Sequence, residues 1–227
     1  MIRSCAIGVT AVGLIVAATV ADAQSPARYR DFQLGGDIAS VTALTGAVAS
    51  DAKTIHTRPA LLQDLEWRRP YAFNNAEVDP VEQIAFSFYN NQLFRLLIDY
   101  DRSRTEGMTD GDMIDALSTM YGAAKAPVKT ARAPIGTLDE ESGTRVATWG
   151  GADFSAVLYR SSYASGFRLI VTSVKLSALA RTATAQALRL DERDAPLRER
   201  ARQKKEADDE RVAKEKARQA NKAVFKP

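Results

Sequence analysis

Cysteine is almost absent from this chain, since Cys5 is its one example in 227 residues. Cys5 lies in a segment that we expect to be removed, so the mature chain has no disulfide, no thiol nucleophile and no cysteine-ligated metal. Histidine is equally scarce, because His56 is the single one. A lone histidine makes neither a convincing metal site nor a Ser–His pair. We therefore expect no bound metal, and we interpret His56 as an ordinary loop residue.

Long apolar runs are also missing, apart from Ala6–Val20 near the start of the chain. Arg3 before this run and the small residues of Ala21-Asp22-Ala23 after it are typical of a secretory signal peptide over 1–23. The alternative is an uncleaved membrane anchor, but the run is shorter than the ~20 residues that a membrane span needs. Cys5 precedes the run, so it is not a lipid acceptor. We predict export to the periplasm or beyond, with no stable membrane anchor after cleavage.

Neither sign of charge dominates, because 31 Lys and Arg face 28 Asp and Glu and give a formal net charge of +3. Removal of 1–23 takes away one basic and one acidic residue, so the net charge stays the same. No basic stretch is interleaved with aromatic residues, and we predict no nucleic-acid partner. No glycine-rich phosphate loop follows a strand-like run, and we expect no cofactor.

The segment Val81–Tyr100 is typical of a β-hairpin, with two apolar-rich runs on either side of Asn90–Asn91. A loop of three residues (90–92) would gather the apolar side chains on one face, whereas a loop of two would scatter them. We therefore predict the longer loop, with Phe86 and Phe94 both facing the core. The expected cross-strand pairs are Phe88 with Phe94, Phe86 with Leu96 and Ile84 with Ile98.

A second segment, 154–173, repeats this design, and Phe94-Arg95-Leu96-Leu97 is echoed by Phe167-Arg168-Leu169-Ile170. A tryptophan ends a short strand-like run before each hairpin, at Trp67 and Trp149. The same loop construction in the second hairpin places one set of side chains inward and Arg160 and Arg168 outward. The inward set is Val157, Tyr159, Phe167, Leu169 and Val171.

Two short amphipathic helices are predicted, one ahead of each strand-and-hairpin unit, over 37–45 and 110–121. They end at Gly46 and Gly122, and Thr109 with Asp112 resembles a capping box. The fold class that follows is α+β: two tandem αβββ repeats that form an antiparallel sheet with helices on one face. The predicted bounds are 24–33 for a polar lead-in, 34–106 and 107–173 for the repeats.

The chain after the last strand is predicted to be helical. Apolar residues at helical spacing indicate a packed helix over 174–193, and Pro196 then bends or restarts it. The tail over 194–227 has no apolar stripe, and its helix is expected to be supported by opposite charges four residues apart. These pairs are Arg202–Glu206, Lys204–Asp208, Lys205–Asp209, Glu210–Lys214 and Arg211–Glu215. Such a tail is either a solvated helix or a docking element. Segment 122–144 is expected to be a disordered loop, since few large apolar residues occur there.

Three short motifs resemble those of serine penicillin-recognising enzymes: Ser50 with Lys53, Tyr89-Asn90-Asn91, and Lys129-Thr130-Ala131. The chain between them is too short for that family's helical subdomain. Ser50 also lies in a polar segment rather than at the start of a core helix, and the second motif falls in the predicted hairpin turn. A serine hydrolase or penicillin-interacting protein that uses Ser50 and Lys53 stays as an alternative.

The helix, the Trp-ended strand and the hairpin, repeated over 34–173, resemble the αβββ units of β-lactamase-inhibitor-protein-like folds. The single unit also resembles SmpA/OmlA-type lipoproteins of the outer-membrane barrel-assembly machinery. This resemblance implies a binding or assembly factor that works outside the cytoplasm. The chain departs from the lipoproteins by lacking a lipid-acceptor cysteine, and from the inhibitors by lacking disulfides.

We therefore predict an exported, non-catalytic protein-binding or envelope-assembly factor with a protein partner in the cell envelope. A second alternative is a carrier of a small apolar ligand between sheet and helices. The partner-binding site is predicted on an open sheet face, because Tyr and Arg are enriched at binding hot spots. Its predicted residues are Tyr89, Arg95, Arg160 and Arg168.

Overall fold

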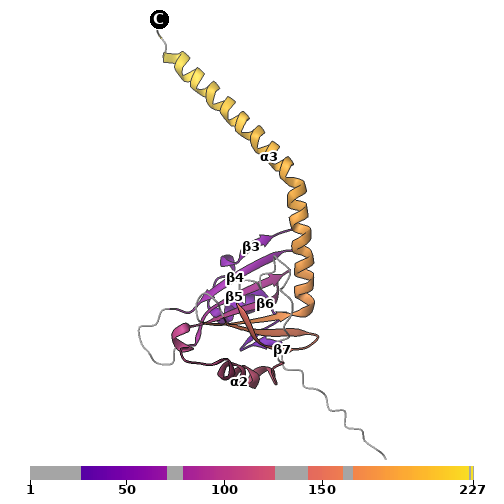
Figure 1. Cartoon of the computed structure of the whole chain (residues 1–227). Helices are drawn as coiled ribbons and strands as arrows, with labels where there is room; N and C mark the ends of the chain where they lie inside the picture. The colour runs from indigo at the N-terminus through magenta and orange to yellow at the C-terminus, as the bar shows by residue number, and fades with distance from the viewer. Residues whose placement is uncertain (1–26, 71–78, 126–142, 161–165, 225, 227) are drawn as a thin grey trace, which may run out of the picture.

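The computed structural model describes residues 27–70, 79–125, 143–160, 166–224 and 226. Within these ranges the protein is α+β, with a seven-stranded antiparallel sheet, a two-stranded sheet and three α-helices, of which the C-terminal one is long (Figure 1). The predicted signal peptide and most of segment 122–144 lie outside the described residues. None of the described helices is long and apolar enough to cross a membrane.

The large sheet has the strand order β3-β4-β5-β6-β9-β8-β7. Strands β4, β5 and β6 follow one another as a meander, and so do β7, β8 and β9, and the two meanders meet where β6 pairs with β9. The strands are β3 (Lys53–His56), β4 (Leu62–Arg68), β5 (Val81–Tyr89), β6 (Gln92–Tyr100), β7 (Thr144–Gly150), β8 (Phe154–Arg160) and β9 (Phe167–Ser173). Strands β1 (Arg28–Tyr29) and β2 (Phe32–Gln33) form the small sheet.

The two short helices have the predicted positions and caps. Helix α1 (Ile38–Thr45) is capped by Asp37, whose carboxylate accepts a hydrogen bond from the Ser40 amide at 2.8 Å, and it ends at Gly46 with a φ of 71°. Helix α2 (Asp110–Tyr121) begins with the complete capping box of Thr109 and Asp112. A local polar side chain thus accepts a hydrogen bond from one free amide in the first turn of each helix. Short 3-10 helices, η1 (Ala49–Asp51) and η2 (Arg102–Arg104), follow α1 and β6.

The main core lies between α1, α2 and one face of the sheet. Phe86 is fully buried there, and the Phe32 ring meets it edge-on with centroids 4.9 Å apart. Trp149 is buried on the same face, and its indole nitrogen donates a hydrogen bond to Ser118 of α2 at 3.1 Å. Other members of this core include Val41, Leu65, Ile84, Leu96, Ile98, Met113, Leu117, Leu158, Leu169 and Val171.

The first hairpin combines the two loop alternatives. Asn90 and Asn91 form a two-residue turn with φ values of 47° and 63°, and Phe88 pairs with Leu93, so the predicted three-residue loop is wrong. A β-bulge at Phe94 then restores the predicted pairs of Phe86 with Leu96 and Ile84 with Ile98. Phe94 is half-buried rather than part of the core. The two-residue turn uses the tolerance of asparagine for positive φ, and the bulge keeps the apolar side chains of both strands on one face of the sheet.

The second hairpin has the opposite face assignment from the prediction in strand β8. Ala156 and Leu158 face the main core, while Val157 pairs with Ile170 and Tyr159 with Arg168 on the other face. The inward placement of Val157 and Tyr159 is therefore wrong, whereas Phe167, Leu169 and Val171 do face the core. The small Ala156 lies opposite the bulky Trp149, and this large–small pair fixes the register.

Helix α3 (Val174–Val224) is continuous and covers the second face of the sheet with its first half. Its buried alanines (180, 183 and 187) are separate from the main core, and it contacts β5, β6, β8 and β9. Ile170 and Tyr159 are each 4% exposed on this second face. The prediction of helices on one face alone is thus wrong, because small alanines let α3 lie close against the sheet.

One ion pair and one longer polar contact link α3 to the edge strand β3 and the residues after it. Arg58 lies 3.1 Å from Asp194, and His56 Nδ1 lies 4.0 Å from an Asp191 carboxylate oxygen. The helix therefore crosses the sheet from β9 to β3. Pro196 stands inside the helix, where the prediction placed a bend, and Figure 1 shows that α3 changes direction after it leaves the sheet.

Candidate functional site

The structure places three of the four residues predicted for a partner site on one face of the sheet, but it does not gather them, because Tyr89 pairs with Gln92 at one end of β6 and Arg168 with Asp99 near the other. Tyr89, Arg95 and Arg168 share the second face of the sheet, and each is half-buried. That face is not open as predicted, because α3 crosses it. Arg160 lies on the opposite side of its strand, so it does not join the other three.

Arg168 and Arg160 each have a carboxylate partner within the fold. Arg168 Nε and Nη2 donate to Asp99 on the paired strand at 2.6 and 3.1 Å. Arg160 Nε and Nη2 donate to one oxygen of Asp110, in the first turn of α2, at 2.8 and 2.6 Å. The Arg160 guanidinium also lies 4.5 Å from the ring centroid of Phe167. These contacts give both arginines a role in holding strands and helices together.

The asparagines of the penicillin-enzyme motif have structural roles in the hairpin turn. Asn90 Oδ1 accepts a hydrogen bond from the Leu61 amide at 2.9 Å, and Asn91 Oδ1 accepts one from the Ile38 amide at 3.2 Å. Ser50 lies in η1 and Lys53 begins β3, and both are exposed. The third motif, Lys129-Thr130-Ala131, lies outside the described residues. The described residues of the three motifs therefore form a hairpin turn and two exposed side chains.

A polar cluster at the surface joins the small sheet to the large one. Arg30 binds Asp79 through two hydrogen bonds of 2.6 and 2.7 Å, and Arg69 donates to the Asp79 carbonyl and to the Asp101 carboxylate. Nearby, Tyr29 and Tyr100 are 3.4 Å apart at their hydroxyl oxygens. Burial raises the pKa of both tyrosines, so the hydroxyls stay protonated.

The carboxylate of Asp101 has the largest acid shift in this region. The Ser103 hydroxyl and then Arg69 donate hydrogen bonds to it and lower its pKa from the ordinary 3.8 to about 2. Asp101 therefore remains charged and caps η2 through the Ser103 amide at 2.8 Å. The Asp79 pKa is also lowered, first by the hydrogen bonds from Arg30. Both carboxylates are engaged in holding the fold.

His56 is the last residue of strand β3, so its interpretation as a loop residue is wrong. Among the described residues there is no group of three or more His, Cys, Asp or Glu side chains that could hold an ion. A shallow surface hollow beside η2 is lined by Glu82, Asp101, Arg102, Ser103 and Glu106, with an arginine among its carboxylates.

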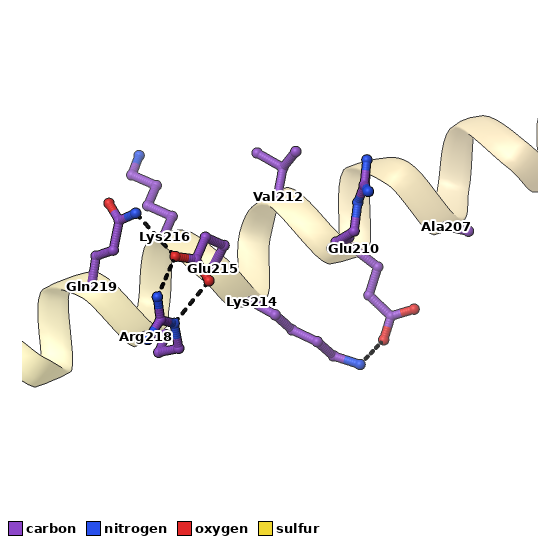
Figure 2. Close-up of a pocket in the computed structure, with 9 residues that line it drawn as sticks. Ala207, Glu210, Val212, Lys214, Glu215, Lys216, Arg218 and Gln219 are labelled. Atoms are coloured by element: carbon purple, nitrogen blue, oxygen red, sulfur yellow. Dashed lines mark hydrogen bonds and ion pairs between the residues drawn. The ribbon is translucent and has the colours of Figure 1, made fainter.

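The remaining candidate is the tail, defined here as Ala195–Val224 of α3. Every residue of the tail is exposed. A hollow runs along it between Ala207 and Gln219, and Figure 2 shows that all the lining side chains come from this one helix. Lys214 and Arg218 project to one side of the helix, while Lys216 and Val212 project to the other (Figure 2). The hollow has no second wall and encloses no ligand-sized space.

Ion pairs run along the tail at helical spacing. Two of the five predicted pairs form, Arg202–Glu206 at 3.2 Å and Glu210–Lys214 at 2.6 Å. The other three, Lys204–Asp208, Lys205–Asp209 and Arg211–Glu215, do not form in this described part of the chain, and Arg211 pairs with Asp208 instead. Pairs three residues apart also form, and these were not predicted: Arg202–Glu199, Arg211–Asp208 and Arg218–Glu215. Hydrogen bonds from Arg202 and Arg218 lower the pKa values of Glu199 and Glu215. The tail is therefore a fully solvated helix that is supported by its own charges.

Comparison with protein-family models, with curated proteins and with solved structures found no match to this chain.

Proposed function

We propose that this protein is a non-catalytic binding or assembly factor of the cell envelope, and that its tail is the element that contacts the partner. The observation that carries the proposal is the complete exposure of the tail, which extends α3 by about 45 Å at ~1.5 Å per residue. Solvated helices without packing are marginal in water. We call the rest of the described protein, which is the two sheets, α1, α2 and α3 up to Asp194, the head. The tail buries no side chain against the head, so the tail is not needed to complete the fold of the head.

The arrangement of the head supports binding rather than catalysis. Its best-connected polar side chains hold structural elements together: Asn90 and Asn91 shape a turn, Arg168 joins two strands and Arg160 joins a strand to a helix. Ser50 and Lys53 are exposed at an edge of the sheet, and neither lines the hollow beside η2 or the one along the tail. Catalytic groups usually converge in a concave site.

We propose further that the head consists of two tandem αβββ repeats. The order of elements supports this, because a capped helix, a Trp-bearing strand and a hairpin occur twice, as α1, β4, β5, β6 and α2, β7, β8, β9. The first unit has η1 and the additional edge strand β3 between α1 and β4. Repeats of this kind resemble those of the extracytoplasmic binding and assembly factors named above. The predicted signal peptide over 1–23 supports the envelope as the place of action.

The test measures how much of the protein co-fractionates with native membranes and periplasm, for the intact chain, a truncated chain and a double variant. A photo-crosslinking residue at Val212, which is exposed, reports on contacts of the tail. We expect the intact chain to form crosslinks and to co-fractionate with the envelope, and a truncation after Asp194 to lose co-fractionation. A variant with Arg95→Ala and Arg168→Ala, which alters the originally predicted sheet-face site, should still associate.

The opposite pattern identifies a different site or activity. If the truncated chain associates normally and the double variant does not, the sheet face is the binding site and the tail proposal is wrong. Labelling by a fluorophosphonate or penicillin probe that disappears in Ser50→Ala would replace the binding proposal with the hydrolase alternative. Circular dichroism of each variant checks that the head is folded.

A further inference from the structure

The tail carries its positive charges unevenly around the helix. At 100° per residue, six cations fall within an arc of about 80°. We call this set the cationic strip: Arg200, Lys204, Arg211, Lys214, Arg218 and Lys222. The strip spans about 33 Å from its first to its last residue at ~1.5 Å per residue. Between Leu197 and Val224, Ala207 is the one other residue whose position falls inside the arc, and no carboxylate does.

Half of the strip has no intramolecular partner among the described residues, since Arg200, Lys204 and Lys222 form no ion pair there. The other three cations pair with carboxylates that flank the arc, at 3.2 Å for Arg211–Asp208, 2.6 Å for Lys214–Glu210 and 2.7 Å for Arg218–Glu215. These pairs are exposed and weak, so an external anion can compete with them.

We propose that the cationic strip binds the flat surface of an anionic lipid bilayer. This inference rests on the proposed function, because it names the partner of the same tail. A cluster of cations on a surface helix is attracted to negatively charged headgroups, and each one near the surface strengthens binding about fivefold. The tail as a whole has a positive excess, with eleven Lys and Arg against six Asp and Glu over 195–227.

The composition of the strip argues against a packed protein interface. Stable protein interfaces have an apolar centre with aromatic or aliphatic anchors. The strip contains no apolar side chain larger than that of Ala207. An extended anionic surface needs no such anchor, since its attraction comes from charge alone.

The flanking carboxylates favour a flat surface over a nucleic-acid groove. A groove surrounds a helix on both sides, so its phosphates would meet Asp208 and Glu215 on one flank and Glu210 on the other. A plane touches the strip and leaves these carboxylates at its margins. The strip carries no large apolar side chain that would insert among acyl chains, so binding is peripheral and is released by salt.

The test is co-sedimentation of the chain from Gln24 onward with vesicles of phosphatidylglycerol and phosphatidylcholine in a one-to-two ratio. The strip variant replaces Arg200, Lys204 and Lys222 by Gln. A matched control replaces Arg202, Lys205 and Lys216, which lie on another face of the helix, by Gln. It removes the same number of positive charges as the strip variant. At about 50 mM salt we expect the strip variant to bind at least tenfold more weakly and the control less than threefold more weakly.

Each other outcome overturns the inference. Equal losses in the two variants would show that net charge, not the strip, governs binding, and equal binding to pure phosphatidylcholine would remove the role of anionic lipid. Displacement from the vesicles by a DNA duplex at equal phosphate concentration would favour nucleic acid. If vesicles fail to bind while the tail still mediates envelope association, the partner is a protein: the lipid inference is then wrong and the proposed function stands.

Discussion

Leu97 of β6 lies directly opposite Ile170 of β9 at the centre of the large sheet. These two residues also occupy the same place in the echoed tetrapeptides at 94–97 and 167–170. An antiparallel pair has a local two-fold axis, and the strand order β4-β5-β6-β9-β8-β7 is symmetric about this pair. The neighbouring pairs follow the same relation: Leu96 with Val171 and Ile98 with Leu169. This register supports the proposal of tandem repeats.

The bulge in the first hairpin predicts unequal roles for two phenylalanines. Phe86 is 0% exposed, whereas Phe94 is half-buried at the bulge. Phe86→Ala should lower the free energy of unfolding by about 3–5 kcal/mol, and Phe94→Ala by about 1–2 kcal/mol. Urea denaturation of both variants measures the difference. Equal losses would indicate the uninterrupted three-residue-loop register instead.

The contact between α3 and the sheet predicts that one buried alanine does not tolerate a charge. Ala183 is 5% exposed, and Ala185 on the same helix is exposed. Ala183→Glu should cost at least about 2 kcal/mol of stability because it buries an unpaired carboxylate, and Ala185→Glu should stay within about 0.5 kcal/mol. Hydrogen exchange over 174–193 should increase in the first variant alone. Similar exchange in both would mean that α3 is not docked in solution.

Acid should weaken the fold in part through Asp101. Its folded-state pKa is lowered to about 2, so the stabilisation is fully present above the ordinary value of 3.8 and is lost as pH falls through about 2. In Asp101→Asn the free energy of unfolding should depend less on pH over this window. A carboxyl-resolved NMR titration checks the cause directly. A midpoint near 3.8 would show that the hydrogen bonds from Ser103 and Arg69 are not formed in solution.

Pro196 predicts a change in the direction of the tail. A proline inside a helix removes one backbone hydrogen bond and costs about 3 kcal/mol relative to alanine. Pro196→Ala should therefore raise helicity and straighten α3. The mature chain is expected to lack cysteine, so spin labels at Thr119→Cys and Ala207→Cys report one distance between head and tail. The same distance with proline and with alanine would show that Pro196 does not set the bend.

Local signals predicted the two short helices and strands β4 to β9, whereas the short strands β1, β2 and β3 were not predicted. The caps at Asp37 and Thr109 act over three residues, so the sequence contains everything that determines them. The hairpin register was harder, because turn chemistry and apolar segregation gave different answers and the bulge at Phe94 satisfied both. Each single criterion therefore predicted part of the register.

The covering of the second sheet face was missed because its signal is weak. Alanines 180, 183 and 187 have little hydrophobic surface, so the sequence pattern does not say which sheet they meet. Tyr159 and Val157 were assigned to the wrong face because the loop construction of the first hairpin was applied to the second. The cationic strip was also missed, although the spacing of Arg200, Lys204, Arg211 and Lys214 on a helix contains the signal.

Helix α3 follows every strand of the large sheet in the sequence, and this order affects how the protein folds. Its first half lies across strands from both meanders, so it can dock after β9 has paired with β6. Until then Leu62, Tyr159 and Ile170 face water on the second side of the sheet. A chain that ends at Ser173 should therefore aggregate even with all of its strands present, whereas one that ends at Asp194 should stay soluble. Residues 174–193 thus dock last, and by covering the apolar second face of the sheet they prevent the molecule from self-associating.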